Sequence, residues 1–245
     1  MQPVGASFSF DGHVVLVTGG ARGIGRGIVE RFAAAGATVV ACGRNEPDDL
    51  SADFVVCDVR DPEQVDTMVD RVVADHGRLD VAFDNAGYQE PRAPVAEQDP
   101  ALYDRVFDTN VRSVYLCLQH QIRIMAEQGG GSIVVNASVS GLRNPNPGLA
   151  LYSASKAAVI SLTRSAAMEA AEKGVRINAV APGRVVTDMM LASKIMDMRA
   201  VAAGLPVRRM GQPEEVAEAV VWLASGAASF VVGHVLCTDG GFMAL

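Results

Sequence analysis

The fold is decided near the start of the chain by Val14-Val15-Leu16-Val17-Thr18-Gly19-Gly20-Ala21-Arg22-Gly23-Ile24-Gly25. The first four of these residues are apolar, mostly β-branched and without helical periodicity, which is typical of a buried parallel strand. A glycine-rich segment follows at once, and beyond it apolar residues recur at helical spacing at Ile24, Ile28 and Phe32 until Gly36. A strand, a glycine-rich turn and a helix in this order begin a βαβ unit.

The same alternation continues to the end of the chain. Further strands are predicted at residues 38–41, 54–57, 79–83, 133–135, 175–180 and 235–238, and helices at 61–77, 101–127, 152–173 and 214–225. This pattern predicts an α/β protein in which residues 1–245 form a single domain, with a doubly wound, seven-stranded parallel sheet and helices on both faces. Residues 1–9 are expected to be flexible, and residues 188–210 to form a substrate-loop insertion.

Composition excludes several classes of function. The 245 residues are 49% hydrophobic and carry a formal net charge of −7 without a cluster of Lys or Arg. We therefore expect neither nucleic acid nor an anionic membrane surface as a partner. The cysteines Cys42, Cys57, Cys117 and Cys237 are scattered, which argues against disulfides or a metal site and favours a cytoplasmic location. No apolar run approaches ~18 residues and the start does not resemble a signal peptide, so no membrane span is predicted.

The glycine-rich turn predicts a phosphate-binding site. Gly19, Gly23 and Gly25 let backbone N–H groups approach an anion without interference from a Cβ atom. The helix that follows adds its positive N-terminal end. The spacing Gly-x-x-x-Gly-x-Gly differs from the commoner Gly-x-Gly-x-x-Gly. Because the turn lies directly between a strand and an amphipathic helix, we expect it to bind a dinucleotide.

The end of the second predicted strand bears on the choice of dinucleotide. A carboxylate there would bond the ribose 2′-hydroxyl of NAD and repel a 2′-phosphate. The sequence has Arg44 instead, whose planar guanidinium suits a 2′-phosphate, and Arg22 in the glycine turn offers a second cation. NADP(H) is therefore predicted as the preferred cofactor, while Glu46 leaves NAD(H) possible. The alternative is that both arginines are only solvated.

Tyr152 and Lys156 are four residues apart at the start of a predicted helix, so they share one helix face. A phenol and an ammonium held in this way form a proton-handling pair, because a nearby cation favours the phenolate and lowers the pKa of tyrosine. Because this spacing is common by chance, the stretch alone favours an interfacial tyrosine beside a solvated lysine.

Taken together, these motifs resemble the short-chain dehydrogenase/reductase family over essentially the whole chain, and in particular its 3-oxoacyl-[acyl-carrier-protein] reductase-like oxidoreductases. The matching segments are Thr18–Gly25, Asp58-Val59, Asp84-Asn85-Ala86-Gly87, Asn110, Ser138, Tyr152 with Lys156, Pro182-Gly183 with Thr187, and Thr238-Asp239-Gly240-Gly241. The resemblance implies a Rossmann fold and an enzyme that transfers a hydride to or from a nicotinamide.

The resemblance also implies a role for each matching residue. Tyr152 would be the general acid and base, Lys156 would lower its pKa and bond the nicotinamide ribose, Ser138 would orient the substrate oxygen, and Asn110 would hold an active-site helix. Asp58 would bond the adenine and Thr187 the carboxamide. The cofactor would contact Gly19, Arg22, Gly23, Ile24, Gly25, Arg44, Asp58, Val59, Asn85, Ala86, Gly87, Tyr152, Lys156, Pro182, Gly183, Val185 and Thr187.

Two positions depart from the family pattern. Asp84 stands where the family usually has asparagine, and we expect it to cap a turn rather than to alter local pKa values. Ser138 precedes Tyr152 by fourteen residues where thirteen is common, which makes Ser140 and Ser153 rivals for its role. Ser138 is preferred because it ends the fifth predicted strand.

The predicted substrate is a small, fairly apolar ketone or secondary alcohol. Flexible apolar side chains, typical of a lid over an apolar ligand or of ordinary packing, crowd the 188–210 segment at Met189, Met190, Leu191, Ile195, Met196 and Met198. Other candidates for the rim of the pocket are Tyr88, Arg92, Leu142 and Arg143.

Several alternatives remain at this point. One is an NAD-dependent dehydrogenase of the same family, and another is a carrier-protein reductase, which the lack of basic residues at 126–129 disfavours. A non-catalytic dinucleotide-binding regulator and a lyase-type relative without a nicotinamide fit less well, because the serine–tyrosine–lysine–asparagine set and the glycine turn are both present. The resemblance further implies a homotetramer or homodimer, formed through helices 101–127 and 152–173 and the C-terminal segment.

Overall fold

The computed structural model describes residues 7–144, 147–192 and 197–245. Seven parallel strands form one sheet in the order β3-β2-β1-β4-β5-β6-β7. Their bounds are β1 Val14–Thr18, β2 Thr38–Gly43, β3 Asp53–Val56, β4 Val81–Asp84, β5 Gly131–Asn136, β6 Val175–Pro182 and β7 Val235–Thr238. The predicted doubly wound, seven-stranded parallel sheet is therefore confirmed.

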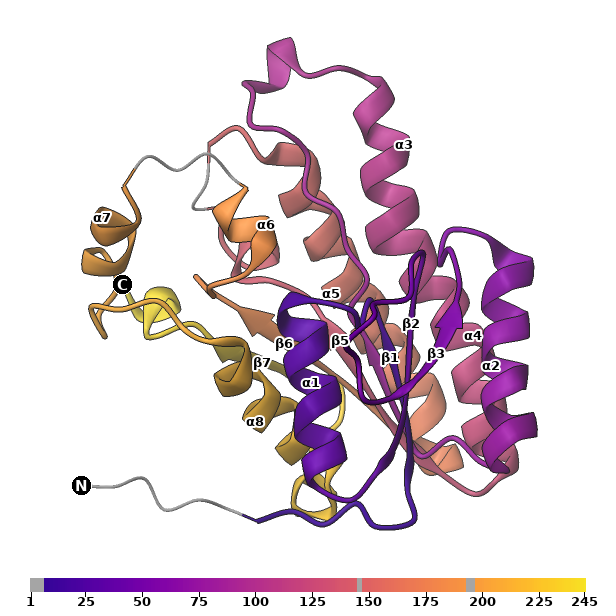
Figure 1. Cartoon of the computed structure of the whole chain (residues 1–245). Helices are drawn as coiled ribbons and strands as arrows, with labels where there is room; N and C mark the ends of the chain where they lie inside the picture. The colour runs from indigo at the N-terminus through magenta and orange to yellow at the C-terminus, as the bar shows by residue number, and fades with distance from the viewer. Residues whose placement is uncertain (1–6, 145–146, 193–196) are drawn as a thin grey trace.

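Helices cover both faces of this sheet (Figure 1). On one face, α1 (Gly23–Ala34) packs against α8 (Pro213–Ala224). On the other face lie α2 (Pro62–His76), α4 (Ser113–Glu127) and α5 (Ala150–Ala170). Each layer has its own apolar core, because parallel strands are buried on both sides. The first predicted strand shows this clearly, since all five residues of β1 are buried.

The order of the strands fixes where a ligand can bind. The chain runs from β1 through α1 to β2 on one side, and it later returns to place β4 on the other side of β1. Helices therefore diverge at the carboxyl ends of β1 and β4, and open α/β sheets bind their ligands in the crevice at this point. The glycine turn after β1 and the residues that follow β4, β5 and β6 all lie at this edge.

The predicted helix over 101–127 contains a break in register that its sequence does not reveal. It consists of α3 (Ala101–Phe107), a single π-helical turn (Asp108–Arg112) and α4. Asn110 lies in that π turn and is fully buried. Such turns insert one extra residue into a helix and are frequent at functional sites.

Two segments beside the sheet end complete the fold. Residues 88–107, with a 3₁₀ turn (Val95–Glu97) and α3, project from the sheet in Figure 1, and α6 (Asp188–Leu191) and α7 (Met198–Ala203) project in the same general direction. The 188–210 segment, expected to form a substrate-loop insertion, thus contains the short helices α6 and α7. Ile195 and Met196 lie outside the described residues, as do residues 1–6. No helix in the described part of the chain is long and apolar enough to cross a membrane.

Candidate active site

The glycine turn after β1 is shaped by close backbone approaches that only glycine permits. A Cβ atom on Gly25 would lie 2.2 Å from the carbonyl oxygen of Gly19. Gly19 and Gly23 have positive φ angles of 65° and 54°, in the left-handed region that favours glycine. The turn therefore brings the N-terminus of α1 to the carboxyl end of β1.

Asn85, directly after β4, holds this turn in place. Its side-chain amide donates to the carbonyl oxygens of Thr18 (3.0 Å) and Gly19 (3.1 Å). Its backbone N–H and that of Ala86 donate to the Thr18 hydroxyl at 2.8 and 3.2 Å. The predicted cofactor residues of β1 and β4 are thus joined into one rigid unit.

The unit fits a dinucleotide pyrophosphate. Arg22 is the N-cap residue of α1, but its side chain accepts no hydrogen bond from the first N–H groups of the helix. These donors and the helix dipole would attract the phosphates, and the exposed Arg22 would add a positive charge. Gly19, Gly23, Ile24 and Gly25 would form the cradle.

The residues expected at the adenosine end lie on neighbouring strands. Arg44 is exposed immediately after β2. The Asp58 carboxylate accepts hydrogen bonds from Arg60 Nε (2.9 and 3.1 Å) and Nη2 (2.5 Å). This contact lowers the pKa of Asp58, and the charge of Arg44 adds to the effect. Asp58 is thus already engaged by a neighbouring arginine at the place where it was expected to bond adenine, and Val59 beside it is buried.

Ser138, Tyr152 and Lys156 meet at the ends of β5 and α5. Ser138 is buried just after β5, and its side chain acts on the phenol of Tyr152, lowering the pKa of that group. The ammonium of Lys156 lies 5.9 Å from the centre of the Tyr152 ring and donates to the carbonyl oxygen of Asn136 at 2.5 Å. Of the three candidate serines, Ser138 is the one whose side chain lowers the pKa of Tyr152.

Burial dominates the pKa values of this cluster. It raises the pKa of Tyr152, an effect that the charge of Glu90 reinforces and the Ser138 side chain opposes. It lowers the pKa of Lys156 to about 8. In the protein alone burial raises the pKa of Tyr152, and the lowering of that pKa by Lys156 stays a prediction.

Asn110 connects the π turn to the active-site loop and to α5. Its Oδ1 accepts from the backbone N–H of Tyr88 at 2.7 Å, and its Nδ2 donates to the Tyr88 carbonyl at 2.8 Å. The same Nδ2 lies 2.9 Å from the hydroxyl of Ser155 on α5. Asn110 thus joins the Tyr88 loop to α5, and its role in holding an active-site helix stays a prediction.

Asn136, which sequence reasoning missed, links the catalytic and cofactor residues. Its carbonyl accepts from Lys156, while its Nδ2 donates to Asn85 Oδ1 at 2.8 Å. Its position at the end of β5, two residues before Ser138, was the one available signal in the sequence.

The chain after β6 faces the glycine turn. Gly183 passes so close to Asp239 that an added Cβ would lie 2.8 Å from the Asp239 Cα. Val185 is buried in the core. Thr187 caps α6 through its hydroxyl, which accepts from Met190 N at 3.2 Å, and its methyl group would lie 3.5 Å from a Cβ on Gly23. Pro182, Gly183 and Thr187 thus border the same crevice.

The expectation that Asp84 caps a turn is wrong. Asp84 is the last residue of β4, only 2% exposed, and its carboxylate accepts from Gln121 Nε2 at 2.8 Å. Burial raises its pKa to about 7, although bonds with Gln121 and the Cys117 thiol work in the opposite direction. The side chain therefore points into the helix layer formed by α4 instead of serving the loop.

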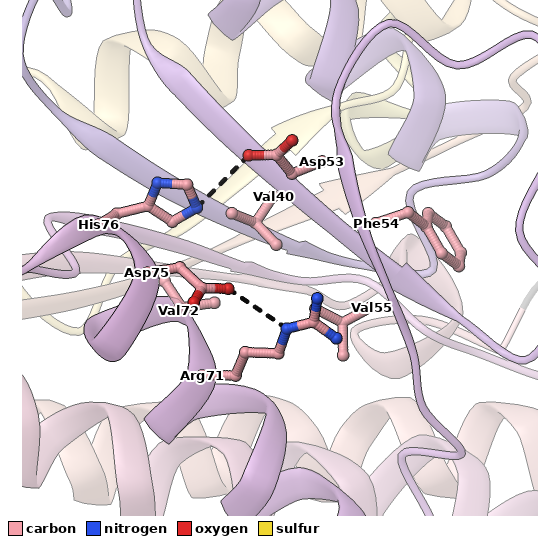
Figure 2. A pocket seen from close by; sticks show the side chains of 8 residues that line it. All are labelled: Val40, Asp53, Phe54, Val55, Arg71, Val72, Asp75 and His76. Carbon is pink, nitrogen blue, oxygen red and sulfur yellow. Dashed lines mark hydrogen bonds and ion pairs between the residues drawn. The ribbon is translucent and has the colours of Figure 1, made fainter.

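A separate hollow lies away from this crevice, between β3 and α2 (Figure 2). It has a volume of about 230 Å³, and its charged residues are paired with one another: His76 with Asp53 at 3.4 Å and Arg71 with Asp75 at 3.3 Å. None of the predicted site residues lines it. Within the described ranges, no group of three or more His, Cys, Asp or Glu side chains is placed to hold a metal ion.

A doubly wound sheet with a phosphate cradle beside a serine–tyrosine–lysine cluster defines a dinucleotide-dependent oxidoreductase. A family model described as Enoyl-(Acyl carrier protein) reductase matches residues 19–243. Cis-4-hydroxycyclohexanecarboxylate dehydrogenase of Sinomonas cyclohexanicum is 43% identical over 248 residues, covering 97% of this chain and 99% of that protein.

Solved structures agree with this relationship. The structure of levodione reductase superposes with a TM-score of 0.91 at 35% identity, covering 96% of this chain and 99% of that one. The structure of ElxO with NADP bound gives 0.89 at 31% identity, covering 95% and 99%. The chain belongs to the short-chain dehydrogenase/reductase family and is an oxidoreductase of the dehydrogenase or reductase type.

Gly25→Ala tests the cradle. Because the new methyl group would overlap backbone, the turn must open, and we expect cofactor affinity to fall at least tenfold and the free energy of unfolding to fall by about 1–3 kcal/mol. Fluorescence titration with NADPH and urea denaturation would measure the two effects. Gly226→Ala is the matched control, since a Cβ there meets no atom within 4 Å. Unchanged NADPH affinity in Gly25→Ala would contradict the assignment.

Asp84→Asn tests the buried carboxyl group. The pKa of Asp84 is about 7 in the folded protein, raised from 3.8, so between these pH values the folded protein holds a proton that the unfolded chain releases. The contribution of this proton to the free energy of unfolding is therefore fully present below about pH 4 and is lost as pH rises through 7. We expect Asp84→Asn to be more stable than wild type at pH 8, by at most about 4 kcal/mol. Thermal unfolding from pH 4 to pH 8 measures the effect. The exposed Asp48→Asn should follow wild type.

Proposed function

We propose that this protein interconverts a secondary alcohol and a ketone with NADP(H) as the preferred cofactor. The observation that carries the proposal is that the Lys156 ammonium lies 5.9 Å from the centre of the Tyr152 ring, while Ser138 lowers the pKa of the Tyr152 phenol and the glycine turn lies at the same sheet edge. In such a site a proton donor, a substrate carbonyl and a nicotinamide would meet.

Each side chain has a distinct part in this chemistry. The nicotinamide would supply or accept the hydride. In the reduction direction, Tyr152 Oη would donate its proton to the developing alkoxide, and Ser138 Oγ would orient the carbonyl oxygen by a hydrogen bond. Lys156 would return a proton toward Tyr152 and bond the ribose. General acid catalysis of this kind contributes about 10²–10⁴-fold to the rate.

A six-membered ring is the substrate skeleton that we infer. The Sinomonas relative is named as a dehydrogenase of cis-4-hydroxycyclohexanecarboxylate, which contains such a ring. A ring alcohol agrees with the small, fairly apolar substrate expected from the sequence. The exposed Met189 and the half-buried Met190 of α6 follow Thr187 and are candidates to contact such a ring.

Two arginines favour a negative group on that ring. Arg184 follows Gly183 at the end of β6, and Arg92 lies on the loop after β4, where its guanidinium donates to Pro147 O at 3.1 Å. Burial lowers the pKa of Arg184, and the charge of Arg92 lowers it further. A carboxylate bound between the two guanidinium groups would relieve their repulsion.

The proposal extends to the cofactor, the assembly and the location of the protein. NADP(H) is favoured by Arg44 and Arg22, with NAD(H) as the alternative. A homotetramer or homodimer in the cytoplasm is the expected form. A carrier-protein reductase is the second candidate, supported by the description of the matching family model and disfavoured by the absence of basic residues at 126–129.

Tyr152→Phe tests the function directly. Without the phenolic proton, we expect turnover to fall at least 10²-fold while cofactor affinity stays within about threefold of wild type. The assay follows nicotinamide absorbance with a panel of ring alcohols and ketones, including 4-hydroxycyclohexanecarboxylate and its uncharged counterpart cyclohexanol. Tyr115→Phe, at an exposed position of α4, is the control. Near-normal turnover of Tyr152→Phe would refute the assignment.

Arg44→Ala tests the choice of cofactor. Loss of a charged hydrogen bond to the 2′-phosphate costs about 1.5–3 kcal/mol, so the KM for NADP(H) should rise roughly 10- to 100-fold while the KM for NAD(H) changes little. Steady-state kinetics with both cofactors measure this. The exposed Arg164→Ala on α5 serves as the control. A wild-type preference for NAD(H) would overturn the prediction.

A further inference from the structure

The loop after β4 holds a buried carboxylate, Glu90, that no motif in the sequence indicates. Only 1% of Glu90 is exposed. Both of its carboxylate oxygens lie 3.1 Å from the backbone nitrogen of Tyr152, whose N–H they share as acceptors. A carboxylate is costly to remove from water unless it is hydrogen-bonded, so this contact is a defined part of the structure.

The hydrogen bond from the Tyr152 N–H to Glu90 caps the start of α5, which no residue of the helix itself caps. The N-cap residue of α5, Leu149, has no side chain that can accept a hydrogen bond, and the first turn contains no acidic residue. The Tyr152 N–H is one of the donors that a helix leaves unpaired at its start. Glu90, 62 residues earlier in the chain, satisfies this donor and places a negative charge at the positive end of the helix.

The loop that carries Glu90 is itself fixed. Asn110 holds Tyr88 by its backbone N–H and carbonyl, at 2.7 and 2.8 Å. The same side chain donates to Ser155 Oγ at 2.9 Å, and this hydroxyl donates to the Tyr152 carbonyl at 2.7 Å. Glu90 and Tyr152 are therefore tied to one another both directly and through Asn110, which keeps the carboxylate at a constant place beside α5.

The negative charge of Glu90 acts on the phenol of Tyr152. It disfavours the phenolate and so adds to the effect of burial, while the Ser138 side chain opposes both. Lys156, on the same helix as Tyr152, holds its ammonium 5.9 Å from the centre of the Tyr152 ring.

We propose that Glu90 is a positioning residue for Tyr152, which caps the helix that carries it and sets, through its charge, the pH range of proton transfer. This inference rests on the proposed function in assigning proton transfer to Tyr152. Glu90 itself touches neither substrate nor cofactor in the proposal.

Two variants distinguish the capping of α5 by Glu90 from the effect of its charge on Tyr152. Glu90→Gln keeps an oxygen that can accept the Tyr152 N–H but removes the charge, whereas Glu90→Ala removes both. Without the charge, Tyr152 should ionise at lower pH. We therefore expect the alkaline decline of ketone reduction, and the acid-side rise of alcohol oxidation, to move to lower pH in both variants. Only Glu90→Ala should also show a lower Tm. The exposed Glu97→Gln, on the same loop and with the same change in net charge, should match wild type.

A second readout needs no turnover. The ionisation of Tyr152 can be followed by ultraviolet absorbance as the difference between each protein and its Tyr152→Phe counterpart, and its midpoint should fall in Glu90→Gln and Glu90→Ala. Midpoints equal to wild type in both variants would overturn the proposal. If wild type turns over none of the panel substrates while the phenol midpoint still falls in the Glu90 variants, the proposed substrate fails and the effect of Glu90 on Tyr152 stands.

Discussion

The site depends on one hydrogen bond, which the buried Lys156 ammonium donates to the carbonyl oxygen of Asn136 at 2.5 Å. The side chain of the same residue donates to Asn85, and the amide of Asn85 in turn holds the backbone of the glycine turn at Gly19. One chain of hydrogen bonds therefore sets the distance between Lys156, for which a part in proton transfer is proposed, and the glycine turn that would hold the phosphates. The position follows from the sheet, because β1, β4 and β5 are consecutive neighbours whose carboxyl ends meet at one edge.

Burial shifts the pKa values of side chains at this edge of the sheet and also lowers the stability of the fold there. Lys156 and Tyr152 lose contact with water, so their charged states depend on the partners that the fold provides and not on solvent. Asp84 shows the cost most plainly: a carboxyl group enclosed at the end of β4 retains its proton up to about pH 7. Active sites commonly violate local rules of stability, and the surrounding α/β core compensates for them.

The sequence predicted the strands, most of the helices and the glycine turn, because these depend on short-range patterns of apolar residues and glycine. It also identified four candidate active-site residues, because their order along the chain resembles that of short-chain dehydrogenases/reductases. These residues are Asn110, Ser138, Tyr152 and Lys156. It missed the π turn at Asn110, whose backbone bonds shift register without any marker such as proline or glycine. Glu90 and Asn136 escaped notice because their importance lies in contacts with residues far away in sequence, and Asp84 was misread because its side chain turns toward α4.

The sequence by itself determined that this chain folds as a doubly wound sheet and that a phosphate cradle follows its first strand, since both arise from interactions between neighbours along the chain. The tertiary structure decided the electrostatics of the site. Whether Tyr152 gains or loses its proton more readily than a free tyrosine depends on how deeply it is buried and on a carboxylate 62 residues away. Pairwise electrostatic energies depend on distance and on exposure to water, and only the folded chain fixes these two quantities.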